Sequence, residues 1–207
     1  PHIDSIALKG SEYYLLTSLE LPIKRLLAAG MGDCYQLGQV FRDGEVGRNH
    51  NPEFTMLEWY RTGFSMLDLM AEVEGLIKSH ADRPLSIQRY SYQALFQEYL
   101  GFDVLEADAE KINQLLNQKN LWQAGQGLLD KDAALDLLFS QAIATQFPDD
   151  QITSVYHYPA SQASLAMINT DDPRTAERFE VYWGEVELAN GFHELANAAD
   201  QLQRFEQ

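Results

Sequence analysis

Three cationic side chains stand close together in a stretch that suits phosphate binding. They are Arg42, Arg48 and His50, in a chain whose formal net charge is −16. Guanidinium groups bind phosphate oxygens through paired hydrogen bonds, and the nearby ring of Phe54 is available to stack on a base. The pattern indicates either a nucleotide-phosphate site or an edge strand with a solvated loop, and the residues alone leave both open.

The segment from Glu53 to Arg61 has the alternation of a strand. Successive side chains on a strand point to opposite faces, so Phe54, Met56, Glu58 and Tyr60 share one face. A carboxylate among aromatic and thioether groups is costly unless it has a partner. We therefore expect Glu58, beside Tyr60, to receive a cationic group.

Two further carboxylates fall on a second predicted hairpin, formed by residues 178–183 and 186–190. A two-residue connection that begins with glycine fits a turn of type II′. That register pairs Glu180 with Ala189 and puts Glu180 diagonal to Glu187, roughly 7–8 Å away at the backbone. Such a pair suits Mg²⁺, which prefers one or two carboxylates together with phosphate oxygens. A solvated acidic face is the alternative.

A glycine interrupts the end of this second hairpin. Gly191 follows the polar residue Asn190 and precedes Glu194 by three positions. Glycine within a strand often marks a bulge, and a bulge turns the neighbouring side chains. We therefore expect a bulge at Gly191 that re-aims Asn190 and Glu194.

The elements that must position these groups alternate between strands and helices. Apolar residues lie on one face of a predicted helix from Ser65 to His80. A shorter predicted helix, Glu20 to Ala29, has Ser18 as its expected N-cap and Pro22 in its first turn. The remaining expected elements are strands at 12–16, 34–41, 53–61, 154–158, 178–183 and 186–190, helices at 91–100, 108–118 and 130–146, and a closing helix at 196–205. This order indicates an α+β fold, with an antiparallel sheet flanked by helices and a helical insertion at about 85–150.

Composition limits the classes of partner and compartment. A surface of net charge −16 repels a polyanion, because nucleic-acid binding depends on Lys and Arg that neutralise phosphates. The single cysteine, Cys34, excludes a disulfide framework and fits a reducing cytoplasm. The sequence shows no apolar run long enough to span a membrane and no signal peptide.

Three separate blocks, in the same order as in a known family, resemble class II lysyl-tRNA synthetases. The segment from Phe41 to Tyr60 is similar to the family's motif 2. The segment from Thr17 to Leu27 is similar to the part that precedes motif 2, and Arg178-Phe179-Glu180 with 187–195 is similar to the metal- and substrate-binding hairpin. Residues 156–166 and the closing run 203–207 resemble the branch of paralogues that modify elongation factor P.

The resemblance implies a partial catalytic domain of that family over residues 1–207. It implies ATP and Mg²⁺ as cofactors, lysine or β-lysine as the amino acid that becomes an adenylate, and a lysine side chain of elongation factor P as the acceptor. It also implies a homodimer for the full-length protein. The implied ATP contacts are Arg42, which is also the catalytic residue, and Asp43, Gly44, His50, Asn51, Phe54, Glu187 and Leu188. The implied amino-acid contacts are Ser18, Leu19, Glu20, Glu58, Tyr60, Asn190 and Glu194, and the implied metal ligands are Glu180 and Glu187.

The chain departs from the family's pattern at several points. Gly44 stands where motif 2 has Glu, with Glu45 one place later, and Leu19 stands where Pro is common. The motif 1 and motif 3 regions are not found, so we expect weak or no activity from these 207 residues alone. Two alternatives stay open: a lysyl-tRNA synthetase fragment that charges tRNA, against which the acidic balance argues, and a non-enzymatic paralogue that acts as a binding module.

Overall fold

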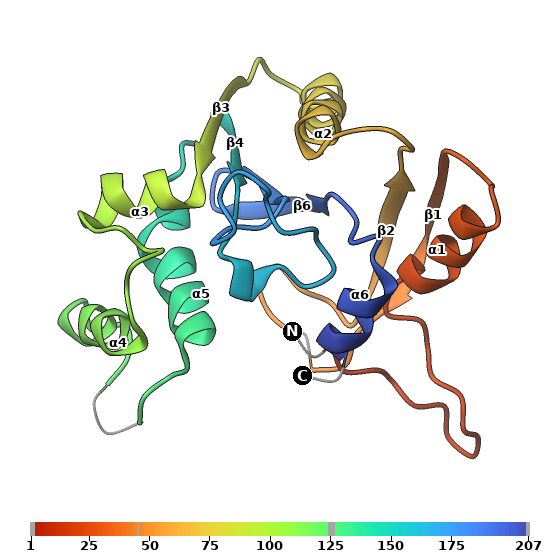
Figure 1. Ribbon diagram of the computed structural model, residues 1–207, viewed down its shortest axis with the longest axis horizontal. Coiled ribbons are helices and arrows are strands. Elements are labelled where there is room, and N and C mark those ends of the chain that lie inside the picture. The colour runs from red at the N-terminus through yellow and green to blue at the C-terminus, as the bar shows by residue number, and fades with distance from the viewer. Residues whose placement is uncertain (1–2, 45, 124–126, 206–207) are drawn as a thin grey trace. The chain divides into compact units, whose positions relative to one another are not determined.

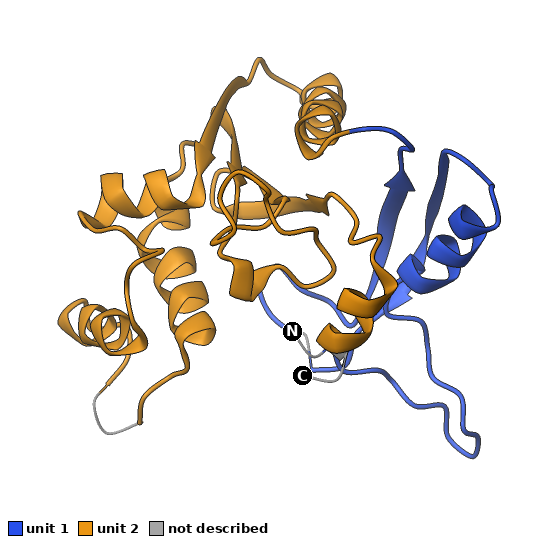
Figure 2. Ribbon diagram, viewed as in Figure 1, with its two compact units in different colours: residues 1–64 blue, residues 65–207 orange. Residues whose placement is uncertain are grey.

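The computed structural model describes residues 3–44, 46–123 and 127–205. It divides the chain into two compact parts, which we call unit 1 (residues 1–64) and unit 2 (residues 65–207) (Figure 2). Helices accompany antiparallel strand pairs in both units (Figure 1). The expected α+β fold is therefore confirmed. Among the described residues, no helix is long and apolar enough to cross a membrane.

The described residues of unit 1 form one helix and one hairpin. Helix α1 spans Glu20–Ala28, and strands β1 (Cys34–Phe41) and β2 (Glu53–Tyr60) pair antiparallel along their whole length. The helix ends before Gly30, whose φ of 89° lies in the left-handed region that favours glycine. Both predicted strands are confirmed, with β2 ending one residue early.

The predicted strand at 12–16 is wrong. That segment forms a single bridge, between Ala7 and Tyr14, and not a strand. The backbone N–H of Leu8 donates to the carbonyl of Tyr13, and that of Leu15 donates to the carbonyl of Ile6. Pairing is limited to this short local turn, so the ladder does not extend into a strand.

Unit 2 is built on a four-stranded sheet in the order β3-β4-β5-β6. The strands are β3 (Ser86–Ser91), β4 (Gln151–Tyr156), β5 (Arg178–Trp183) and β6 (Val186–Phe192). Neighbouring strands are antiparallel except β3 and β4, which run parallel. Strand β3 was not predicted, because its six residues fall in the region expected to be helical. Strand β4 begins and ends earlier than the predicted 154–158.

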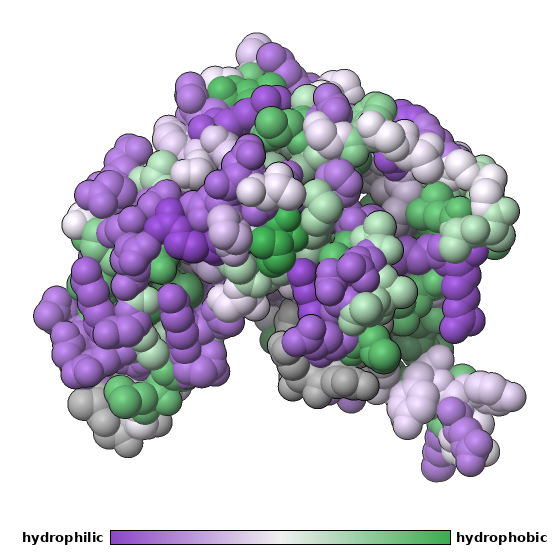
Figure 3. Space-filling model, in the orientation of Figure 1, coloured by the Kyte–Doolittle hydropathy of each residue, from purple (hydrophilic) through white to green (hydrophobic). Residues whose placement is uncertain are grey.

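Helices cover both faces of this sheet. The helices of unit 2 are α2 (Met66–His80), α3 (Tyr92–Leu100), α4 (Ala109–Gln118), α5 (Lys131–Ala142) and α6 (Ala198–Phe205), with 3₁₀ turns η2 (Ala144–Gln146) and η3 (Ala160–Gln162). Helix α2 packs on β4, β5 and β6. Helices α3, α4 and α5 enclose the main core with Val155, Tyr158 and Tyr182 on the other side. Their outer surface is mostly hydrophilic (Figure 3).

Helix α2 is fixed at its start and in its middle. Ser65 and Asp68 form a reciprocal capping box at its N-terminus. Glu74, which is 2% exposed, accepts two hydrogen bonds from Arg89 of β3, at 2.9 and 2.6 Å. It also accepts one from Ser154 of β4, at 2.7 Å. A buried carboxylate needs such partners, and this network ties the helix to two neighbouring strands.

Candidate functional site

The hairpin of unit 1 presents the predicted face. Phe54, Met56, Glu58 and Tyr60 are half-buried, whereas Glu53, Thr55 and Leu57 on the opposite face are exposed. The register places Val40 opposite Phe54 and Gln36 opposite Glu58. The alternation predicted from the sequence is confirmed, and it puts an aromatic ring and a carboxylate on the same side of β2.

The partner of Glu58 comes from the start of α1. One carboxylate oxygen accepts a hydrogen bond from the hydroxyl of Ser18 (2.7 Å), and the other accepts one from the backbone N–H of Leu19 (2.8 Å). A carboxylate can accept about four hydrogen bonds in all. Glu58 thus joins two segments of the predicted amino-acid site and keeps capacity for a further donor.

Ser18 is not the N-cap that the sequence predicts. The N-cap of α1 is Leu19, which makes no side-chain capping bond. The Ser18 hydroxyl accepts from the N–H of Glu20 (2.9 Å) while it donates to Glu58. The carboxylate of Glu58 on β2 therefore sets the position of Ser18. Glu20 itself pairs with Lys24, one turn further along α1, at 2.6 Å.

Backbone hydrogen bonds close the predicted phosphate loop at its base and at its tip. The N–H of Arg42 donates to the carbonyl of Pro52 (2.9 Å). Gly47 and His50 exchange two hydrogen bonds, at 3.1 and 3.3 Å, at the tip. His50 and Asn51 are exposed there. The loop therefore holds its polar groups toward solvent, where a phosphate could reach them.

Arg42 and Phe54, predicted to act on the same ligand, lie together. The Arg42 guanidinium carbon is 5.2 Å from the centroid of the Phe54 ring, a cation–π distance. Position 44 has a φ of 73°, which L side chains rarely adopt. The local backbone explains why glycine stands there. Asp43 accepts from the N–H of Gly44 at 2.9 Å, and Glu45 lies outside the described residues.

The hairpin of unit 2 differs from the predicted register. Glu180 pairs with Asn190, not with Ala189, because the register shifts between Val181 and Tyr182. The extra residue on β6 is Leu188, so the bulge is not at Gly191 as predicted. Gly191 has another role: a Cβ at that position would overlap the ring of Phe179.

This bulge brings the predicted polar residues onto one face. Tyr182 pairs with Glu187 and Glu180 pairs with Asn190, and residues two apart on a strand share a face. Glu180, Glu187 and Asn190 therefore lie on the same side of the sheet. Leu188 is 46% exposed and Glu194, after β6, is half-buried beside Ala166.

Glu180 is buried and accepts three hydrogen bonds. Arg178 donates to one carboxylate oxygen, while the hydroxyls of Tyr158 (2.7 Å) and Tyr182 donate to the other. Burial and the nearby charge of Glu180 raise the pKa of Tyr158 and that of Tyr182 far above the usual value. Both hydroxyls therefore remain protonated and donate to the carboxylate of Glu180.

Arg178, which donates to Glu180, also acts on Asp136 of helix α5. Burial raises the pKa of Asp136, an effect that the charge of Arg178 opposes. Arg178 also donates to the carbonyl of Gln162 (3.1 Å) and lies 4.5 Å from the ring centroid of Tyr158. Sequence reasoning missed Arg178, Tyr158 and Tyr182 as partners of Glu180. The spacing of Arg178, Glu180 and Tyr182, two apart on one strand, was the available signal.

Glu180 and Glu187 of unit 2 could supply part of the ligand shell of a divalent cation. Among the described residues, no group of three or more His, Cys, Asp or Glu side chains could hold a metal. Mg²⁺, however, commonly takes one or two carboxylates and completes its shell with water and phosphate oxygens. Glu180 and Glu187 share one face of the sheet, so this pair fits Mg²⁺ that is bound together with a phosphorylated ligand.

Comparisons with known proteins give a consistent result. The family model for class II tRNA synthetases (D, K and N) matches residues 2–207. A protein of Yersinia enterocolitica named elongation factor P--(R)-beta-lysine ligase is 49% identical over 201 residues, which are 97% of this chain and 62% of that protein. Proteins of the same name from Enterobacter sp. (strain 638) and Salmonella paratyphi B are each 48% identical over 199 residues, 96% of this chain and 61% of theirs.

Proposed function

The chain belongs to the class II tRNA synthetases (D, K and N), and we propose that it activates (R)-β-lysine or lysine with ATP and passes it to a lysine side chain of elongation factor P. The chain spans 61–62% of the length of the relatives that carry the ligase name. The 49% identity over 97% of the chain is the observation that supports this substrate and this acceptor most directly. The single cysteine fits a cytoplasmic protein.

In the first proposed step, the amino-acid carboxylate attacks the α-phosphorus of ATP and pyrophosphate leaves. Arg42 binds the α-phosphate and offsets the negative charge that develops there. Phe54, already in contact with the Arg42 guanidinium at 5.2 Å, stacks the adenine. Asp43, Gly44, His50, Asn51 and Leu188 supply the further ATP contacts. Mg²⁺ bound by Glu180 and Glu187 would neutralise charge on the phosphate oxygens.

The amino groups of the substrate are held by carboxylates. Glu58 and Tyr60 take the distant ammonium with Glu194, while Glu20 takes the other amino group and Asn190 lies near the carboxylate. The bonds from Ser18 and Leu19 to Glu58 support this role, because they fix the carboxylate on the β2 face. Binding of this substrate requires Glu20 to turn from Lys24 toward the incoming ammonium.

In the second proposed step, the ε-amine of the acceptor lysine attacks the carbonyl carbon of the adenylate. An amide bond forms, the bond to the phosphate oxygen breaks, and AMP leaves with that oxygen. The amine loses a proton in the process. No side-chain nucleophile is required, because positioning of two bound reactants supplies much of the rate.

Pyrophosphate exchange tests the activation step without an acceptor. We expect the full-length protein with ATP, Mg²⁺ and (R)-β-lysine to exchange labelled pyrophosphate into ATP. The variant Glu187→Gln should require a higher Mg²⁺ concentration for the same rate, whereas Glu185→Gln, in the adjacent turn, should not. Exchange that is absent under all these conditions would exclude an adenylate-forming enzyme and favour a binding module.

A further inference from the structure

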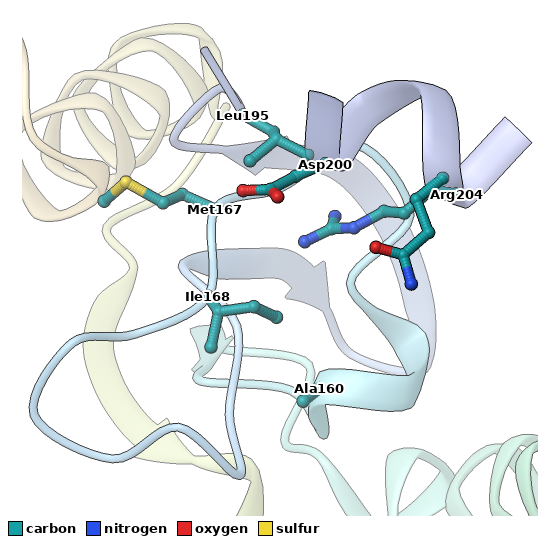
Figure 4. A pocket seen from close by; sticks show the side chains of 7 residues that line it. Ala160, Met167, Ile168, Leu195, Asp200 and Arg204 are labelled. Carbon is teal, nitrogen blue, oxygen red and sulfur yellow. The ribbon is translucent and has the colours of Figure 1, made fainter. Parts of the chain in front are cut away.

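Unit 2 contains a pocket of about 460 Å³ that the proposed reaction does not use. It lies between the segment from Ala160 to Ile168 and helix α6 (Figure 4). Met167, Ile168 and Leu195 give it apolar walls. Asp200 and Arg204 extend into it from α6 (Figure 4). The pocket therefore combines an alkyl-binding surface with one group of each charge.

Arg204 is fixed in place by backbone carbonyls. One terminal nitrogen, Nη1, donates to the carbonyls of Ser164 and Ala166, both at 2.6 Å. A guanidinium has five N–H donors in a rigid plane. Among the described residues the other donors of Arg204 form no further hydrogen bond, so they can donate to a ligand in the pocket.

Asp200 stands one turn before Arg204 on the same helix. Opposite charges at this spacing commonly pair, yet these two form no ion pair in the part of the chain that the structure describes. Within that part, the Asp200 carboxylate also has no other hydrogen-bond or ionic partner. The two carbonyls hold the Arg204 guanidinium in place, and Met167, Ile168 and Leu195 also line the pocket.

We propose that this pocket binds a small aliphatic zwitterion, an amino-acid-like molecule, in addition to the substrates of the proposed reaction. Its carboxylate accepts from the remaining donors of Arg204, its ammonium donates to Asp200, and its alkyl chain lies against Met167, Ile168 and Leu195. Both polar contacts are charge-assisted and so are stronger than neutral hydrogen bonds. The inference rests on the pocket alone and stands whether or not the proposed function is correct.

Isothermal titration of the full-length protein with three probes tests the pairing of charges. L-norleucine carries both charges and an alkyl chain, pentylamine lacks the carboxylate, and hexanoate lacks the ammonium. None carries a second ammonium for Glu58. We expect norleucine to bind about tenfold or more tightly than either other probe, since each lacks one charge-assisted contact.

A matched pair of variants locates the binding. Asp200→Asn should weaken norleucine binding about tenfold, whereas Asp82→Asn, an exposed aspartate elsewhere in unit 2, should leave it unchanged. Asp200 is exposed and its carboxylate holds no other group, so the variant should fold as the wild type does. Absence of norleucine binding, equal binding of pentylamine, or equal binding by Asp200→Asn would each overturn the proposal.

Discussion

At the scale of single residues, Glu58 is the group on which the proposed amino-acid site depends most. Its two hydrogen bonds to Ser18 and Leu19 orient the carboxylate, but they also give it a structural role at the start of α1. The two roles make different predictions for kinetics. Loss of charge should affect a bound ammonium, whereas loss of a structural bond should affect all ligands of unit 1.

We predict that Glu58→Gln raises the KM for the amino acid about 10- to 100-fold, because a charge-assisted hydrogen bond is worth about 1.5–3 kcal/mol. The KM for ATP should change little. Steady-state pyrophosphate exchange, with each substrate varied in turn, measures both constants. The exposed Glu53→Gln on the same strand is the control. Equal increases in the two constants would refute the role assigned to Glu58.

The tyrosines around Glu180 predict a dependence of stability on alkaline pH. In the folded state the pKa values of Tyr158 and Tyr182 are higher than the value of about 10 that tyrosine has in the unfolded chain. The stability that depends on their protonation is thus fully present below pH 10 and is lost as pH rises further. We expect the free energy of unfolding of wild type to fall more steeply above about pH 10 than that of Tyr158→Phe.

Urea unfolding at several pH values between about 9 and 11 measures this slope. Tyr35→Phe is the control, because Tyr35 is 74% exposed. The same slope for wild type and Tyr158→Phe would show that Tyr158 loses its proton at an ordinary pH.

At the scale of elements, the β5–β6 hairpin depends on the close approach of Gly191 to Phe179. A Cβ at position 191 would overlap the buried ring, so Gly191→Ala should destabilise unit 2 by about 1–3 kcal/mol. Gly75 lies on an exposed part of α2 with open space around it. Gly75→Ala should therefore be neutral or stabilising by up to about 1 kcal/mol. Denaturant unfolding compares the two, and equal effects would remove the close contact as an explanation.

Helix α2 should depend on the pair formed by Glu74 and Arg89. Removal of one partner of a buried ion pair costs about 3–5 kcal/mol, and partial exposure of Arg89 reduces this. We expect Arg89→Met to lower the free energy of unfolding by about 2–4 kcal/mol. Lys78→Met, an exposed change on α2, should alter it by less than about 0.5 kcal/mol. An Arg89→Met variant as stable as wild type would mean that Ser154 alone satisfies Glu74.

The sequence predicted the elements whose signals are local. Strands β1 and β5 begin and end where alternation and turn residues place them. Strand β3 escaped prediction because its mixed residues pair in parallel with β4, which is about 65 positions away. The bulge at Leu188 escaped prediction because the residue types of β6 fit an uninterrupted two-residue hairpin register equally well. The partner of Glu58 lies 40 positions earlier in the chain, and no local pattern reveals such a contact.

At the scale of the whole molecule, charge and relatedness support the same acceptor. A formal charge of −16 disfavours a polyanion such as tRNA. The relatives that match 96–97% of this chain are named for a protein acceptor, elongation factor P. These observations favour transfer to a protein over transfer to a nucleic acid.

Competition between the two acceptors tests transfer to elongation factor P. The full-length protein is given ATP, Mg²⁺ and labelled (R)-β-lysine with equimolar elongation factor P and lysine tRNA, and the label in each acceptor is counted. We expect label in elongation factor P and none in tRNA, with no labelling of a factor whose acceptor lysine is replaced by arginine. Label in the tRNA, with none in the factor, would contradict it.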